Sequence, residues 1–240
     1  LGATIYTMPS APGLGSGYTI SYADEKATPD TGFEISTKAD GGWSTESVTV
    51  SPGGKLFVRK AADGSIPAGV YCENTLDERP NAPDNLQGTN ETFADEEDGK
   101  ITGISSNMEY RLSSETDWTP CTGDSVTNLA PGTYLVRYKA TGSTFASVEA
   151  IVEIATGEQR TYTLNVTAPA FDPVTYGYTQ PEAKAITINN AGNSNSTISS
   201  VTVDNKNFVI GGSGSAVIAG GSINTWTIRP AAELNAGTYT

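Results

Sequence analysis

The fold of this chain is decided by one turn-then-strand stretch, Leu129-Ala130-Pro131-Gly132-Thr133-Tyr134-Leu135-Val136-Arg137-Tyr138-Lys139-Ala140. It begins with a Pro-Gly turn and continues as an alternating run. Successive side chains of a strand point to opposite faces. The run therefore predicts Tyr134, Val136 and Tyr138 on one face of a strand, with Leu135, Arg137 and Lys139 on the other.

The same unit occurs twice more in diverged form, in residues 51–61 and in residues 234–240. Around the first of these copies the agreement extends to other features in the same order. Met108-Glu109-Tyr110 corresponds to Phe33-Glu34-Ile35, Val136-Arg137 to Val58-Arg59, and Trp118 to Trp43. A period of roughly 75–80 residues indicates an array of small modules. The third copy predicts a strand at the end of the sequence.

Turn signals recur roughly every 8–12 residues, and no long helical periodicity is present, which is typical of β-sandwiches. We therefore predict an all-β chain of tandem immunoglobulin-like or fibronectin-III-like β-sandwich domains. Residues 1–76 and 77–157 form two copies of one repeat. Residues 158–240 form a sandwich of a different subtype that is truncated at its C-terminal end, because the sequence stops inside a predicted strand.

Composition excludes several classes of function. The net charge of −13 opposes binding to nucleic acid or to an anionic membrane surface. No apolar run approaches the ~20 residues that a membrane span needs. The chain contains no histidine, which removes Ser–His and Cys–His catalysis and nearly every route to a zinc site. Two cysteines, Cys72 and Cys121, are too few for a disulfide framework and are interpreted as isolated thiols.

The second module resembles a β-sandwich repeat of large surface proteins from Gram-positive bacteria. The resemblance is carried by residues 98–104 (Asp-Gly-Lys-Ile-Thr-Gly-Ile), 108–113, 118–120 and 129–139. The first module looks like a diverged copy, and the third resembles another bacterial immunoglobulin-like domain through residues 174–181 and 186–193. The resemblance implies secretion, attachment to the cell wall and a stalk or adhesive role. It supplies no catalytic residues.

The acidic run 95–98 (Asp-Glu-Glu-Asp) is the candidate metal site, with Asp95, Glu96 and Asp98 as ligands for calcium. Hard cations take several oxygen ligands, and carboxylates at a domain joint would stiffen an array. The run lacks the alternating Asp spacing that folds oxygens around one ion, and adjacent residues of an extended segment point apart. A solvated loop is therefore preferred over a calcium site.

Four aromatic residues are candidates for ligand binding: Tyr176, Tyr178, Trp43 and Trp118. Aromatic rings stack on the apolar faces of sugars, so a glycan-binding face is one interpretation. The two tryptophans recur at one place in two modules beside turn signals, which favours packing in the core. Tyr176 and Tyr178 flank Gly177 in a loop-like segment and are expected to be exposed.

These observations predict a non-enzymatic structural or adhesive segment of an exported bacterial cell-surface protein, acting as a stalk or spacer that presents other domains. We expect it to be extracellular and associated with the cell wall, monomeric, and without a cofactor. Two alternatives stay open. One is a module that binds a glycan or a host extracellular protein, and the other is an accessory segment of a carbohydrate-active enzyme.

Overall fold

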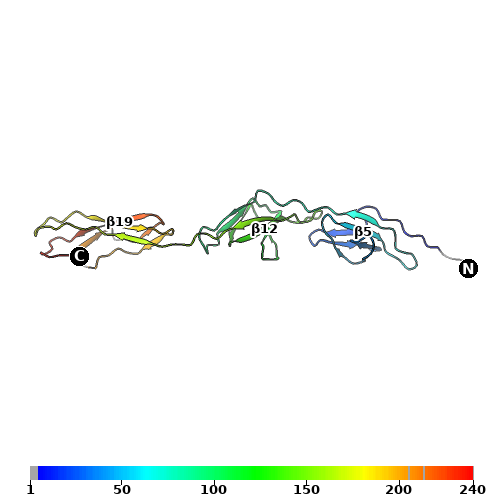
Figure 1. Ribbon diagram of the computed structural model, residues 1–240, viewed down its shortest axis with the longest axis horizontal. Coiled ribbons are helices and arrows are strands. Elements are labelled where there is room, and N and C mark those ends of the chain that lie inside the picture. The colour runs from blue at the N-terminus through cyan, green and yellow to red at the C-terminus, as the bar shows by residue number, and fades with distance from the viewer. Residues whose placement is uncertain (1–4, 205, 213, 240) are drawn as a thin grey trace. The chain divides into compact units, whose positions relative to one another are not determined.

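The computed structural model describes residues 5–204, 206–212 and 214–239, and all its regular secondary structure there is β (Figure 1). Contacts divide the chain into two compact units, unit 1 (Leu1–Gly157) and unit 2 (Glu158–Thr240). None of the described residues forms a helix that could cross a bilayer. Thr240, at which the third predicted module was expected to be truncated, lies outside the described residues.

The N-terminal part of unit 1, called here the first repeat, is a sandwich of two three-stranded antiparallel sheets. One sheet has the order β1 (Tyr18–Ser21), β2 (Lys26–Pro29), β4 (Val48–Thr49), and the other β3 (Phe33–Ser36), β5 (Lys55–Lys60), β6 (Cys72–Thr75). Apolar side chains of both sheets meet between them. The fully buried members of this core include Ala27 from the first sheet and Ile35, Leu56 and Val58 from the second.

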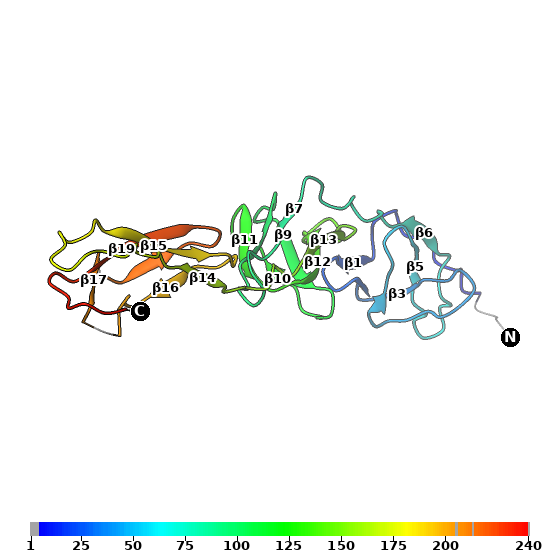
Figure 2. The same cartoon turned by 60° about the vertical axis from the view of Figure 1, so that its left-hand side comes forward.

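The rest of unit 1, the second repeat, is built in the same way (Figure 2). Its smaller sheet has the order β11 (Ser125–Leu129), β8 (Gly99–Thr102), β7 (Gln87–Thr89). Its larger sheet has the order β10 (Thr119–Pro120), β9 (Met108–Leu112), β12 (Gly132–Tyr138), β13 (Ala150–Ile154). Ile101 of β8 and Met108, Val136 and Val152 of the larger sheet are buried in the core between them.

The predicted alternation in the 129–140 stretch is confirmed in β12. Tyr134 and Val136 are buried in the core, whereas Leu135 and Arg137 are half-buried on the opposite face. The copy at residues 51–61 also forms a strand, β5. The third copy does not. Residues 234–239 contain no strand, and that prediction is wrong, because these described residues pair with no neighbouring strand and lie against the end of unit 2 instead.

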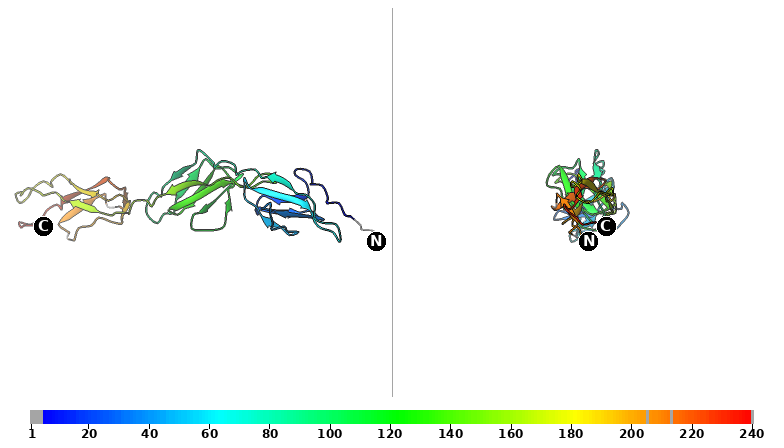
Figure 3. Two further views of the ribbon diagram at one scale, coloured as in Figure 1. Left: turned by 45° about the vertical axis from the view of Figure 1, so that its right-hand side comes forward. Right: turned by 90° about the vertical axis from the view of Figure 1, so that its left-hand side faces the viewer.

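Unit 2 is a single sandwich of two sheets (Figure 3). Its four-stranded sheet has the order β14 (Leu164–Thr167), β15 (Lys184–Asn190), β19 (Ile223–Pro230), β17 (Phe208–Gly211), and its second sheet pairs β16 (Ser196–Ile198) with β18 (Ala216–Ile218). Four buried residues form the core, namely Ile186, Ile188, Ile218 and Trp226. The fully buried Asn190 ties the sheets together, since its Nδ2 donates to the carbonyls of Ser194 and Ile218.

The two repeats of unit 1 meet at a seam. Phe145, in the connection between β12 and β13 of the second repeat, is 1% exposed and belongs to the core of the first repeat. Its ring packs edge-on against Tyr22 at 4.9 Å. Arg79 forms an ion pair with Glu25 of the first repeat and donates 3.0 Å to the carbonyl of Ala146. The seam explains why both repeats form one compact unit. The division of the chain into three domains at residues 76/77 and 157/158 stays a prediction.

Candidate functional site

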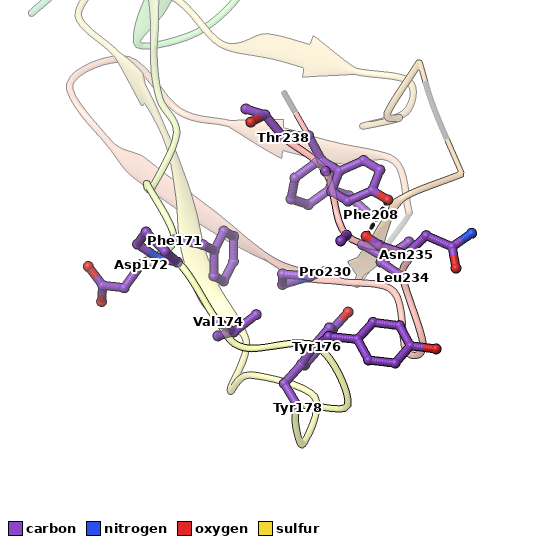
Figure 4. A pocket seen from close by; sticks show the side chains of 14 residues that line it. Phe171, Asp172, Val174, Tyr176, Tyr178, Phe208, Pro230, Leu234, Asn235 and Thr238 are labelled. Atoms are coloured by element: carbon purple, nitrogen blue, oxygen red, sulfur yellow. Dashed lines mark hydrogen bonds between the residues drawn. The ribbon is translucent and has the colours of Figure 1, made fainter.

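An aromatic cleft of about 360 Å³ lies at one end of unit 2. It is lined by the segment between β14 and β15, by the facing ends of β17 and β19, and by residues 234–239. Figure 4 shows Phe208 above Pro230 and the two tyrosines Tyr176 and Tyr178 below it. Both tyrosines that the sequence singled out therefore line the same cleft.

The two tyrosines are held differently. Tyr178 was also expected to be exposed, and that expectation is wrong: the side chain is half-buried, because its hydroxyl donates to the carbonyl of Ala231 at 2.6 Å and holds the ring beside β19. Tyr176 is 77% exposed, as expected from the sequence. Gly177 between them has φ of +79°, a conformation that favours glycine, and it forms the turn that carries both rings.

Three further aromatic side chains complete the cleft, and sequence reasoning missed all of them. The ring centres of Phe171 and Phe208 lie 6.1 Å apart, and the ring planes are tilted by 36° to each other. The hydroxyl of Tyr239 donates to the carbonyl of Asn235 at 2.7 Å, which closes the 234–239 segment on itself. The available signal was the Ala-Phe-Asp-Pro sequence at residues 170–173, where an apolar ring precedes a turn-forming proline.

The tryptophans do not lie in a hydrophobic core, so the core-packing interpretation is wrong. Trp43 is half-buried on the outer face of the β3–β5–β6 sheet, where the Arg59 guanidinium lies 3.9 Å from the ring centre. Arg59 Nε also donates 2.6 Å to Glu34 across the β3–β5 pair. Tyr71 covers this arrangement, with its ring centre 6.0 Å from that of Trp43.

The second repeat contains the same three side chains in the same geometry. Arg137 Nε donates 2.7 Å to Glu109, and its guanidinium lies 3.9 Å from the centre of Trp118. We call these two sets the Glu–Arg–Trp clusters. They result from the repeated pattern, because Glu109 and Arg137 are directly paired across β9 and β12 as Glu34 and Arg59 are across β3 and β5.

The second cluster borders a cleft of about 320 Å³ at the seam, which Glu25 and Lys139 also line. Its charged groups already have partners. Glu25 pairs with Arg79, Glu109 with Arg137, and Lys139 Nζ donates 2.7 Å to the carbonyl of Ser106. The Glu25–Arg79 pair joins the two repeats, and the other two contacts lie within the second repeat, which indicates a structural role for these polar side chains.

The acidic run 95–98 forms a hydrogen-bonded loop. Asp98 accepts from the backbone N–H and the hydroxyl of Thr92 at 2.9 and 2.6 Å, and these bonds lower the pKa of its carboxyl. The nearby Glu91 is buried and accepts from the N–H groups of Glu97 and Gly157. Nowhere in the described part of the chain, the proposed ligands Asp95, Glu96 and Asp98 included, are three metal-binding side chains grouped to hold an ion.

Cys72 and Cys121 are free thiols. Cys121 belongs to the core of the second repeat, and burial raises the pKa of its thiol. Cys72 is half-buried in β6. Neither side chain lies in the aromatic cleft or the seam cleft.

No protein-family model and no curated protein matches the chain. Among solved structures it is similar to the fibronectin domains FN1–FN3 of chicken CNTN1, with 13% sequence identity over 89% of this chain and 88% of that one. The TM-score is 0.25. At that score the likeness carries no weight, and the assignment to the β-sandwich class rests on the paired sheets and the cores between them.

Proposed function

We propose that this chain is a non-catalytic structural segment of an exported bacterial surface protein, and that it acts as a spacer presenting other domains outside the cell. The seam in unit 1 carries this proposal. A spacer must hold its modules in a set orientation, and a linker of a few polar residues would let two sandwiches swivel freely. Here a core residue of one repeat comes from the other.

The energy of the seam is sufficient for that role. Complete burial of a phenylalanine side chain contributes about 1.5–3 kcal/mol, and Phe145 is buried almost completely. The Arg79–Glu25 ion pair adds a directional contact, and both side chains in it are 31% exposed. Reorientation of one repeat against the other would require these contacts to break together.

Placement at a bacterial surface is supported by the sequence. Residues 98–104 and 129–139 resemble surface-protein repeats, and the chain has few charged residues, at 17%. A surface solvated mainly by hydroxyl and amide groups suits an extracellular β protein. The absence of histidine agrees with a role that requires no general acid or base at neutral pH.

The proposal is tested by the variant Phe145→Ala in the full chain, followed by hydrogen–deuterium exchange of peptides that cover β5 and β12. Large-to-small changes of buried phenylalanine cost about 3–5 kcal/mol, so exchange of the β5 amides should accelerate by at least about 100-fold. The β12 peptide, in the repeat that donates Phe145, should change far less.

Ile151→Ala is the matched control, because Ile151 is also an apolar residue of the second repeat but is 68% exposed. It should leave β5 unchanged. Equal β5 protection in wild type and Phe145→Ala would show that the repeats are not coupled, and a spacer with a stiff joint would then be excluded.

A further inference from the structure

We propose that the aromatic cleft of unit 2 binds a neutral oligosaccharide. The inference is independent of the spacer proposal, since every residue that carries it belongs to unit 2 and the seam lies in unit 1. It rests on three observations: the rings that line the cleft, the polar groups beside them, and the charge of the lining.

Aromatic rings dominate the lining. The five aromatic residues come from three segments: Phe171, Tyr176 and Tyr178 from the loop between β14 and β15, Phe208 from β17, and Tyr239 from the 234–239 segment (Figure 4). Pyranose rings carry C–H groups on their flat faces, and these pack against aromatic rings as other apolar surfaces do. A volume of about 360 Å³ lies within the range of small-ligand sites and accommodates one or two sugar rings.

Polar groups are present where sugar hydroxyls would need them. The Tyr176 hydroxyl and the Asn235 side-chain amide make no hydrogen bond to any other described residue, although both line the cleft. The hydroxyls of Tyr178 and Tyr239 each donate to a backbone carbonyl, so their oxygens retain acceptor capacity toward a ligand. A purely hydrocarbon ligand could form no hydrogen bond with these groups.

The charge of the lining selects a neutral ligand. Asp172 is the one carboxylate among the described lining residues. Lys184 is not in the lining, but its Nζ lies 5.2 Å from the centre of the Phe171 ring and donates to the carbonyl of Ala170. One carboxylate and one neighbouring ammonium leave the cleft with no net charge to attract uronic acids, sialic acids or sulfated sugars. The arrangement therefore favours a saccharide of neutral hexoses or N-acetylhexosamines.

Tyr176 supplies the most accessible ring and is the position to test. Because it is 77% exposed, its replacement should not disturb the fold. Tyr176→Ala removes the ring and the hydroxyl, whereas Tyr176→Phe removes the hydroxyl alone. Tyr162→Ala is the control, since Tyr162 is 62% exposed in the same unit and lies outside the cleft.

The experiment presents the full 240-residue chain to an array of neutral oligosaccharides (cello-, malto-, manno- and chito-oligosaccharides), with hyaluronan hexasaccharide and a proline-rich peptide in parallel. Titration calorimetry then measures the best neutral binder. Loss of one stacking contact worth about 0.5–1.5 kcal/mol should weaken binding by about 2- to 10-fold in Tyr176→Ala, with less loss in Tyr176→Phe and none in Tyr162→Ala.

Four outcomes would overturn the inference. They are a blank neutral array with folded protein, tighter binding of hyaluronan, binding of the proline-rich peptide alone, and unchanged affinity in Tyr176→Ala. None of these outcomes bears on the exchange behaviour of Phe145→Ala, so failure of this proposal and failure of the spacer proposal can be told apart.

Discussion

Arg59 and Arg137 each satisfy two partners at once. The planar guanidinium donates to a glutamate across the strand pair and also stacks on a tryptophan ring. Lysine has neither the fork geometry nor the flat face for this. The clusters differ in what else contacts the tryptophan. Tyr71 covers Trp43. Trp118 instead lies beside the seam cleft, and the guanidinium of Arg111 is 4.8 Å from its ring centre.

Gly103 is a single residue whose identity the backbone dictates. It has φ of +80°, and a Cβ at this position would lie 2.3 Å from the carbonyl oxygen of Asn85. Gly103→Ala should therefore destabilise unit 1 by about 1–3 kcal/mol, through both the backbone conformation and the close contact. The measurement is the urea midpoint of the full chain.

Gly123→Ala provides the comparison for Gly103. Nothing lies within 4 Å of a Cβ at Gly123, and its φ is not in the left-handed region. That variant should unfold at or slightly above the wild-type midpoint. Similar destabilisation by both substitutions would contradict the explanation from local geometry.

The environment of a single residue could be predicted from the sequence where it depends on neighbouring residues in the chain. The exposure of Tyr176 follows from its place beside a turn glycine, and the structure confirms it. The location of Trp43 and Trp118 was wrong because their partners, Arg59 and Arg137, lie far along the chain. Recurrence in two repeats signalled that each tryptophan packs on something, but not on which face of the sheet.

At the scale of elements, β12 and β5 show how one pattern produces two equivalent strands. Each presents apolar side chains to the core and an arginine to the outer face, directly opposite a glutamate. The alternation is a property of the strand itself, so it was predictable. Pairing is not a property of one strand, which is why the similar sequence at residues 234–239 forms none.

The outer-face clusters give a prediction at this scale. Arg137→Lys keeps the charge but loses the fork and the stacked plane, so it should cost about 1 kcal/mol. Arg59→Lys should cost a similar amount, because the ion pairs have matching distances of 2.6 and 2.7 Å. Denaturant unfolding of the two variants and of Lys55→Arg, at an exposed position of β5, measures this. A loss no larger than that of the exposed variant would mean that the clusters are ordinary surface ion pairs.

At the scale of the whole molecule, the three cores differ in where their residues come from. The core of unit 2 draws all its residues from residues 186–228, whereas the core of the first repeat takes Phe145 from the second. Repeats in a sequence predict where one module ends, but they do not predict that a side chain of one module packs in the core of another. Phe145 is one aromatic residue in a loop, and nothing in its neighbours indicates the core that it enters.

The self-contained core predicts independent unfolding of unit 2. Its four buried residues are few, so we expect unit 2 to unfold first, in a transition of its own. Trp226 is 4% exposed and reports on that transition by fluorescence. Trp226→Phe should remove the early signal and leave the later one in place. A single cooperative transition of the whole chain would contradict this expectation.

Because Phe145 of the second repeat packs in the core of the first, it also determines when the first repeat can complete its folding during synthesis. A chain emerges from the ribosome with its N-terminal end first. All strands of the first repeat are then available before Phe145 appears, yet the core they enclose is incomplete until the β12–β13 connection has followed. The first repeat therefore cannot complete its core until part of the second repeat has been made. A chain interrupted between β6 and Phe145 would hold an unfinished sandwich with exposed apolar surface, the kind of intermediate that chaperones bind.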